Sequence, residues 1–150
     1  MTSRRKTREL ALSCCYEIEV GQQDVREVLD RVAAEQTLDP NSETFLRAAV
    51  TQVFTNQVEV DKIIEELAIG WKIDRIARVD LAILRLSIVE LLVGLEDPPP
   101  PDPVVINEAI VLAKKFSTAD SGRFVNGILA SVEKEKEKFQ ARLRSSGTSQ

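Results

Sequence analysis

Residues 79–93 read VDLAILRLSIVELLV, and this stretch decides the fold. In a helix of this sequence, apolar side chains fall on nearly every side, interrupted only at Asp80, Arg85, Ser87 and Glu90. A surface helix needs one apolar face, whereas a helix that is apolar all round has to be packed by neighbours on several sides. The stretch therefore predicts the central helix of an all-α core, with Arg85 and Glu90 pairing along its length.

Helical spacing continues before this central stretch. Apolar residues recur every three or four positions in four segments, which begin near Arg4, Asp24, Ser42 and Asn56. Asp24 and Ser42 suit helix N-caps, because their side chains accept hydrogen bonds from free backbone N–H groups. These segments predict four helices ahead of the central one.

Glycine and proline mark further helix ends. Gly70 ends the fourth segment, and the Trp71 indole beside it is expected to cover an apolar seam. The prolines within residues 98–103 end the central helix, because proline lacks the backbone donor and its ring clashes inside a helix. A sixth helix follows them, and Asp120 or Ser121 suits the N-cap of a seventh.

These elements define the expected architecture. Sustained alternation of apolar and polar residues is missing, so the sequence predicts an all-α fold of about seven helices in two packed helical sub-bundles. The first sub-bundle is expected to span about 4–56 and the second about 57–140, within one domain of residues 1–144. The charged run 133–138 suits a solvated helical extension, and residues 145–150 suit a disordered tail.

Composition narrows the class of protein. The chain has 150 residues, of which 43% are hydrophobic, enough for one core. No apolar run approaches the roughly 18 residues of a membrane span, and no apolar segment follows the N-terminal charges, so we expect a cytoplasmic protein. Cys14 and Cys15 are adjacent and cannot form an ordinary disulfide, which suits a reducing compartment.

Catalysis is disfavoured by residue types that are missing. The chain contains no histidine, the commonest general base and metal ligand. It has no glycine-rich phosphate loop, and adjacent cysteines lack the spacing of a zinc site. We therefore expect no enzymatic activity, no cofactor and no metal, although carboxylate or lysine catalysis stays formally open.

Charge points to one local site. The net charge is -4, so a phosphate-binding surface has to be confined to part of the molecule. Arg4, Arg5, Lys6 and Arg8 form a cluster of cations near the N-terminus, with no carboxylate before Glu9. This cluster is a candidate for nucleic-acid phosphates. A solubilising or frayed terminus is the alternative reading of the same residues.

Four strings carry a family resemblance. RRKTRELALSCCYE (4–17), GWKIDRIARVDLAILRLSIVELL (70–92), VINEAIVLAKKFS (105–117) and SGRFVNGIL (121–129) resemble, in order and spacing, segments of the NusB family. Together they extend from residue 4 to residue 129. The resemblance implies a scaffold of a three-helix and a four-helix bundle that acts in transcription antitermination of ribosomal RNA operons. It implies binding of boxA-type single-stranded RNA together with the ribosomal protein NusE and the transcription elongation complex.

The resemblance also suggests RNA-contacting residues. Arg4, Arg5, Lys6 and Arg8 match the family's arginine-rich start, and guanidinium groups fork onto phosphates or stack on bases. Phe124 matches a family aromatic that a base can stack on. Asp120 matches a position near the RNA surface. The alternatives are a core role for Phe124 and a helix N-cap for Asp120.

For the protein partner, Tyr16 and Asp80 match family positions on the side that faces NusE. Tyr16 is alternatively a residue that closes the first bundle, and Asp80 a cap of the central helix. Two departures stand out: the proline-rich insert at 98–103 is longer than the family's usual turn, and Leu81 stands where a basic residue is common. A helical protein-interaction module or homodimer without RNA affinity remains the competing function.

Overall fold

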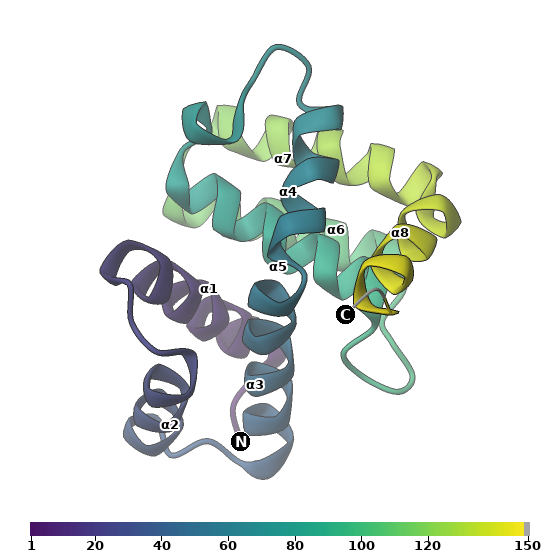
Figure 1. Ribbon diagram of the computed structural model, residues 1–150. Helices are drawn as coiled ribbons and strands as arrows, with labels where there is room; N and C mark the ends of the chain where they lie inside the picture. Colours follow the sequence, from purple (N-terminus) through teal and green to yellow (C-terminus); the bar gives the residue numbers. More distant parts are fainter. Residues whose placement is uncertain (149–150) are drawn as a thin grey trace.

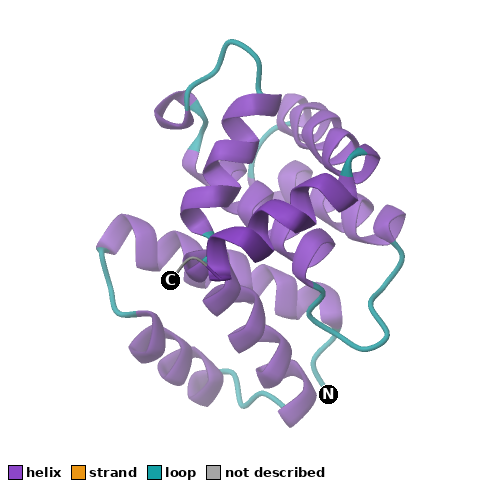
Figure 2. Ribbon diagram, turned by 45° about the vertical axis from the view of Figure 1, so that its right-hand side comes forward, coloured by secondary structure: helices purple, strands orange, loops and turns teal. Residues whose placement is uncertain are grey.

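The computed structural model describes residues 1–148, whose helices are joined by loops, with no strand in this part of the chain (Figures 1 and 2). The order along the chain is α1 (Arg4–Gly21), α2 (Val25–Glu35), α3 (Pro40–Thr55), α4 (Gln57–Leu67), the short 3-10 helix η1 (Ile73–Arg75), α5 (Arg78–Val93), α6 (Asp102–Phe116), α7 (Ala119–Lys134) and α8 (Lys136–Thr148). The all-α prediction is confirmed. The described residues contain eight α-helices rather than about seven.

The helices fall into two groups around α5. Helices α1, α2 and α3 pack on one another, and α6, α7, α8 and α4 lie on the other side (Figure 1). Only Asn56 separates α3 from α4, so these two helices follow one another end to end. Helix α5 contacts α1 and α3 of the first group and α4, α6, α7 and α8 of the second. We propose a division of the domain at Asn56, with α5 joining its two parts.

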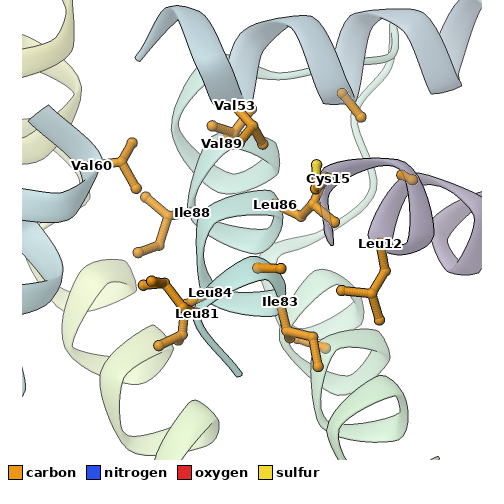
Figure 3. Close-up of a cluster of buried hydrophobic side chains, with 14 of the residues drawn as sticks. Leu12, Cys15, Val53, Val60, Leu81, Ile83, Leu84, Leu86, Ile88 and Val89 are labelled. Carbon is orange, nitrogen blue, oxygen red and sulfur yellow. The ribbon is translucent and has the colours of Figure 1, made fainter. Parts of the chain in front are cut away.

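The core surrounds α5, as the sequence predicts. Every residue from Asp80 to Leu92 is buried. Figure 3 shows side chains of other helices gathered around it, among them Leu12 and Val53 from the first group and Val60 from α4. Leu12, Val53 and Val60 belong to the same continuous cluster as the apolar residues of α5. Leu81 is 3% exposed within it, which explains an apolar residue where the family resemblance suggests a basic one.

Arg85 and Glu90 are both buried on α5, but they do not pair with each other. Arg85 forms ion pairs with Asp61 at 2.8 Å and with Glu19. Glu90 pairs with Arg8 at 2.7 Å. The predicted pairing along α5 is therefore wrong, because partners from neighbouring helices compensate both charges.

Two predicted helix starts are shifted towards the N-terminus. Asp39, not Ser42, caps α3, and its carboxylate accepts hydrogen bonds from the backbone N–H of Ser42 and from that of Thr2. Thr118, not Asp120 or Ser121, caps α7 by accepting from the Ser121 N–H. Both shifts have the same reason: the hydroxyl or carboxylate that precedes the first turn reaches the free donors, and the residues within that turn do not.

The C-terminal region differs from the predicted solvated extension. Glu135 leaves the helical backbone region, with φ -119° and ψ 36°, and separates α7 from α8. Helix α8 turns back onto the body and buries Phe139 and Leu143. It continues to Thr148, past residue 145, where the sequence predicts a disordered tail to begin. Residues 149–150 of that predicted tail lie outside the described part of the chain.

Candidate nucleic-acid interface

The cationic cluster lies on the first turns of α1. Ser3 caps this helix by accepting a hydrogen bond from the Lys6 N–H at 3.1 Å. Cations at a helix N-terminus face the positive end of the helix dipole, which is unfavourable. The structure relieves this by bringing carboxylates from elsewhere in the chain to three of the four cations.

Arg4 and Arg5 each meet one carboxylate. Arg4 pairs with Glu96 at 2.8 Å, and its guanidinium lies 4.2 Å from the centre of the Phe45 ring. Arg5 donates two hydrogen bonds of 3.0 Å to the carboxylate of Glu108 on α6. The hydrogen bonds from Arg5 lower the pKa of Glu108, and the same contact raises the pKa of Arg5. The Arg5 side chain nevertheless remains 56% exposed.

Arg8 lies in a buried ion pair with Glu90. The side chains are 11% and 6% exposed, and the guanidinium donates to both carboxylate oxygens, at 3.1 and 2.7 Å. Arg8 thus joins α1 to the central helix and presents little surface to a phosphate. Lys6, by contrast, is exposed and forms no ion pair with any described residue. Within residues 1–148, Lys6 is thus a cation without an ion-pair partner. Arg5 belongs to an exposed ion pair, and Arg4 and Arg8 belong to more enclosed ion pairs.

Phe124 lies near the start of α7. It is half-buried and packs partly on the core, so both predicted roles fit its position. It borders an open hollow of about 330 Å³ that Asp120 and Trp71 also line. Asp120 is fully outside the core and forms an ion pair with Arg123 on the same helix. It is not the cap of α7, so that alternative reading is wrong.

Asp80 lies deeper in the same hollow and is only 7% exposed. It occupies the first turn of α5 without capping it. One carboxylate oxygen, Oδ2, accepts a hydrogen bond of 2.8 Å from the Ser121 hydroxyl, while Oδ1 is buried with no hydrogen-bond partner among the described residues. Asp80 therefore holds the start of α7 against α5. This burial gives it less surface for a protein partner than the resemblance suggests.

Tyr16 borders a separate, mostly apolar hollow. The ring is 42% exposed, and the hollow of about 240 Å³ is also lined by Leu12, Val79 and Phe116. Phe116 itself is 45% exposed at the end of α6. An apolar depression with two accessible aromatic rings suits a protein contact. Tyr16 does not close the first bundle, because its ring lies at the surface.

Helix α6 connects the cationic end with the Phe124 region. Glu108, the partner of Arg5, lies eight residues before Phe116, a rise of about 12 Å along a helix. Next to Phe116, Lys115 pairs with Glu9 of α1 at 2.8 Å, so ion pairs link α6 to α1 at two positions. Only Ser117 and Thr118 then separate α6 from α7, which carries Phe124. Helix α6 therefore leads from the cationic end towards the start of α7.

Two exposed aromatic residues were not assigned to a site by sequence reasoning. Phe116 is the last apolar residue of the string VINEAIVLAKKFS, where periodicity alone places it in the core. Trp71 was expected to cover an apolar seam, but its ring is 55% exposed. The signal for Trp71 was its place directly after Gly70, whose φ of +86° turns the chain outward.

Residues 1–148 contain neither a membrane-spanning helix nor a cluster of metal-ligating side chains. None of the helices in residues 1–148 combines the length and apolar character that crossing a bilayer requires. In the same range, no three His, Cys, Asp or Glu side chains are grouped as metal ligands would be. The cysteines are buried, and burial raises the pKa of Cys14 to about 11.

Comparison with known proteins gives a consistent result. The NusB family matches residues 5–134. The transcription antitermination protein NusB of Acetivibrio thermocellus is 41% identical over 133 residues, 89% of this chain and 90% of that protein. The protein of the same name from Symbiobacterium thermophilum is 44% identical over 138 residues, covering 87% and 88%.

Solved structures agree with the sequence relatives. NusB of T. maritima superposes with a TM-score of 0.81 at 32% identity, covering 93% of this chain and 98% of that one. NusB in the crystal structure of the antitermination factors NusB and NusE with dsRNA gives a TM-score of 0.77 at 25% identity, covering 88% and 96%. Sequence and fold together show that this chain belongs to the NusB family.

Proposed function

We propose that the protein is an RNA-binding adapter in transcription antitermination, which binds boxA-type single-stranded RNA together with ribosomal protein NusE. The observation that carries this proposal is the course of α6, which leads from accessible cations at one end towards the helix that carries Phe124 at the other. Unpaired RNA needs cations for its phosphates and aromatic surfaces for its bases. The relatives are antitermination proteins, and one solved structure holds NusB and NusE in complex with dsRNA.

Arg5 and Lys6 carry the phosphate contacts in this proposal. Lys6 is exposed and unpaired within the described residues, and Arg5 is more than half exposed although it pairs with Glu108. Exposed ion pairs contribute little to stability, so a phosphate can replace Glu108 at small cost. Arg4 contributes less because Glu96, Asn41 and the Phe45 ring already hold it. We assign Arg8 a structural role.

Phe124 supplies the stacking surface, with Asp120 at its edge. The half-buried ring is anchored in the core on one side and borders the open hollow on the other. A ring held in this way loses little conformational freedom when a base stacks on it. Asp120 limits how closely phosphates approach, because its negative charge is exposed beside the ring.

The Tyr16 hollow is the proposed contact for NusE. It is lined by apolar groups and lies on α1, α5 and α6, beside the RNA-binding face rather than on it. Two proteins that share one RNA bind more tightly together than either does alone, because the second contact is intramolecular. A role for Asp80 in this contact is confined to its small exposed edge.

We propose no catalytic activity. The full chain lacks histidine, and burial raises the pKa of the Cys14 thiol, which opposes formation of a nucleophilic thiolate. The acidic overall charge and the sequence composition fit a cytoplasmic scaffold.

A titration of labelled boxA-type RNA at two salt concentrations, with and without NusE, tests the adapter function. We expect salt-dependent binding that NusE tightens. The double variant Arg5→Ala/Lys6→Ala is expected to bind more weakly and to lower the salt slope by about 0.7 per lost phosphate contact. The matched control is Arg26→Ala/Lys134→Ala, which removes the same charge from exposed sites on α2 and α7. Equal affinities of the two double variants would reject the cationic site.

A protein-interaction module without RNA affinity is the second candidate. The observation that favours it is the pairing of Arg4, Arg5 and Arg8 with carboxylates. It predicts that the RNA titration shows no binding, while sedimentation shows self-association that Tyr16→Ala weakens.

A further inference from the structure

Trp71 and Phe124 together border two hollows on the same side of the molecule. The first hollow, of about 330 Å³, is bounded further by the 3-10 helix and the starts of α5 and α7. The second, of about 380 Å³, is bounded further by the end of α4 and by α7 residues including Arg123 and Ile128. The two aromatic residues are common to both linings. They therefore stand at the boundary between two adjoining depressions.

The position of Trp71 leaves its ring available. It lies in the loop between α4 and η1, which projects at the top of Figure 1. The indole is 55% exposed, and the neighbouring Ile69 is 89% exposed. Exposing so much apolar surface at one loop has a hydration cost that a ligand covering it would remove.

The charges around these rings favour RNA as that ligand. Lys72 and Arg75 are exposed in the same loop, and neither forms an ion pair with a residue of the described chain. Arg123 stands on the other side, paired with the exposed Asp120. Three cations, Lys72, Arg75 and Arg123, lie around the rings and balance the three carboxylates there, those of Asp74, Asp80 and Asp120, although the whole chain carries a net charge of -4. Aromatic faces flanked by free cations are the combination that binds unpaired nucleotides.

We infer that Trp71 is a second base-stacking residue, which extends the single-stranded RNA site from Phe124 across both hollows. An unpaired base on each side of the Trp71 and Phe124 boundary would contact an aromatic face, with Arg75 and Lys72 near the connecting phosphates. The inference rests on the proposed function, since it assigns a further part of the same RNA site. The binding surface that it adds lies outside the N-terminal cluster of cations.

The chain offers a direct spectroscopic test, because Trp71 is its only tryptophan. A base stacked on the indole is expected to quench its fluorescence, with the same midpoint as RNA binding followed by anisotropy of labelled RNA. Quenching is expected to be smaller for an RNA shortened so that it reaches the cationic end only. Binding without any change in tryptophan fluorescence would overturn the inference and leave the proposed function standing.

Substitutions supply the second readout. Trp71→Ala is expected to weaken RNA binding by about 5- to 150-fold, the range for loss of one stacked base. Trp71→Phe should restore most of the affinity, because it retains an aromatic face. The matched control is Val58→Ala, which removes an exposed apolar side chain from α4, outside the linings of both hollows. Circular dichroism and the unfolding midpoint confirm that each variant folds.

The outcomes separate the two proposals. Absence of RNA binding by the unmodified chain would refute the proposed function. RNA binding that Trp71→Ala leaves unchanged would refute only the stacking role of Trp71. Loss of NusE binding in Trp71→Ala with RNA affinity unchanged would also refute it, and would assign the exposed indole to a protein contact.

Discussion

Arg5 on α1 and Glu108 on α6 are joined by two hydrogen bonds of 3.0 Å each, in the forked geometry that guanidinium also uses for phosphate. The carboxylate therefore occupies the position that an RNA phosphate would take on Arg5. Since the Arg5 side chain is 56% exposed, either partner can reach it. If Arg5 binds RNA as proposed, Glu108 competes with RNA for it within the same molecule.

Glu108→Gln is expected to tighten RNA binding several-fold at neutral pH. The variant removes the charge that competes for Arg5 and retains a side chain of similar shape. The measurement is the dissociation constant of labelled RNA, compared with that of Glu43→Gln, which removes a carboxylate from α3. Weaker binding by Glu108→Gln would show that the pair positions Arg5 instead of competing for it.

The same pair gives a pH dependence. Because Arg5 lowers the pKa of Glu108 below its ordinary 4.5, the pair stabilises the fold above that value. This contribution is lost as the pH falls through the lower pKa of the folded state. Denaturant unfolding followed from neutral pH to well below pH 4.5 should therefore show a smaller loss of stability for Glu108→Gln than for the unmodified chain. A larger loss in the variant would contradict the assigned sign.

Arg8→Ala is expected to destabilise the fold by about 3 to 5 kcal/mol, because it leaves the Glu90 carboxylate buried and unpaired. The double variant Arg8→Met/Glu90→Leu should recover most of that loss, since it removes both charges together. Urea unfolding of the three proteins measures the effect. A marginal change in Arg8→Ala would mean that Arg8 is free in solution and available to RNA.

Asp80 and Ser121 are expected to be energetically coupled. The hydroxyl of Ser121 donates to Asp80 at 2.8 Å in a buried setting, where a hydrogen bond to a charged group is worth about 1.5 to 3 kcal/mol. A double-mutant cycle of Asp80→Ala and Ser121→Ala, followed by denaturant unfolding, measures this coupling. Additive effects would remove the structural role of Asp80 and leave partner binding as its explanation.

Cys14 is expected to react slowly with thiol reagents at pH 8. Burial raises its pKa to about 11, so little of it is thiolate at that pH, and the pKa of Cys15 is raised as well. Adding denaturant should accelerate labelling of both thiols to the rate of a model peptide. Rapid labelling of the folded protein would show that α1 opens at this point.

The sequence predicted the helices well where side-chain pattern and packing agree. Residues 79–93 have apolar groups on all sides, and α5 is indeed surrounded. The break at Glu135 was not predictable, since the alternating charges of 133–138 continue a good helical sequence. The sequence left Phe139 and Leu143 able to contact the body or another subunit, and both are buried against the body.

The site residues suggested by the resemblance stay a prediction, but the state of their side chains is on view in the structure. Phe124 borders an open hollow, and Arg4, Arg5 and Arg8 are engaged by carboxylates. Their partners Glu96, Glu90 and Glu108 lie 82 to 103 positions away along the chain, so no local pattern could reveal the ion pairs. For Trp71, hydrophobicity favoured burial, while the positive φ of Gly70 directs the loop outward.

The position of α5 has a consequence for how the molecule opens. Because both groups of helices bury their apolar sides on this single helix, neither can detach without exposing it to water. Amide hydrogens of residues 80–92 should then exchange only through global unfolding, with one common free energy of opening. An antitermination scaffold built in this way presents its RNA and protein surfaces as one rigid unit.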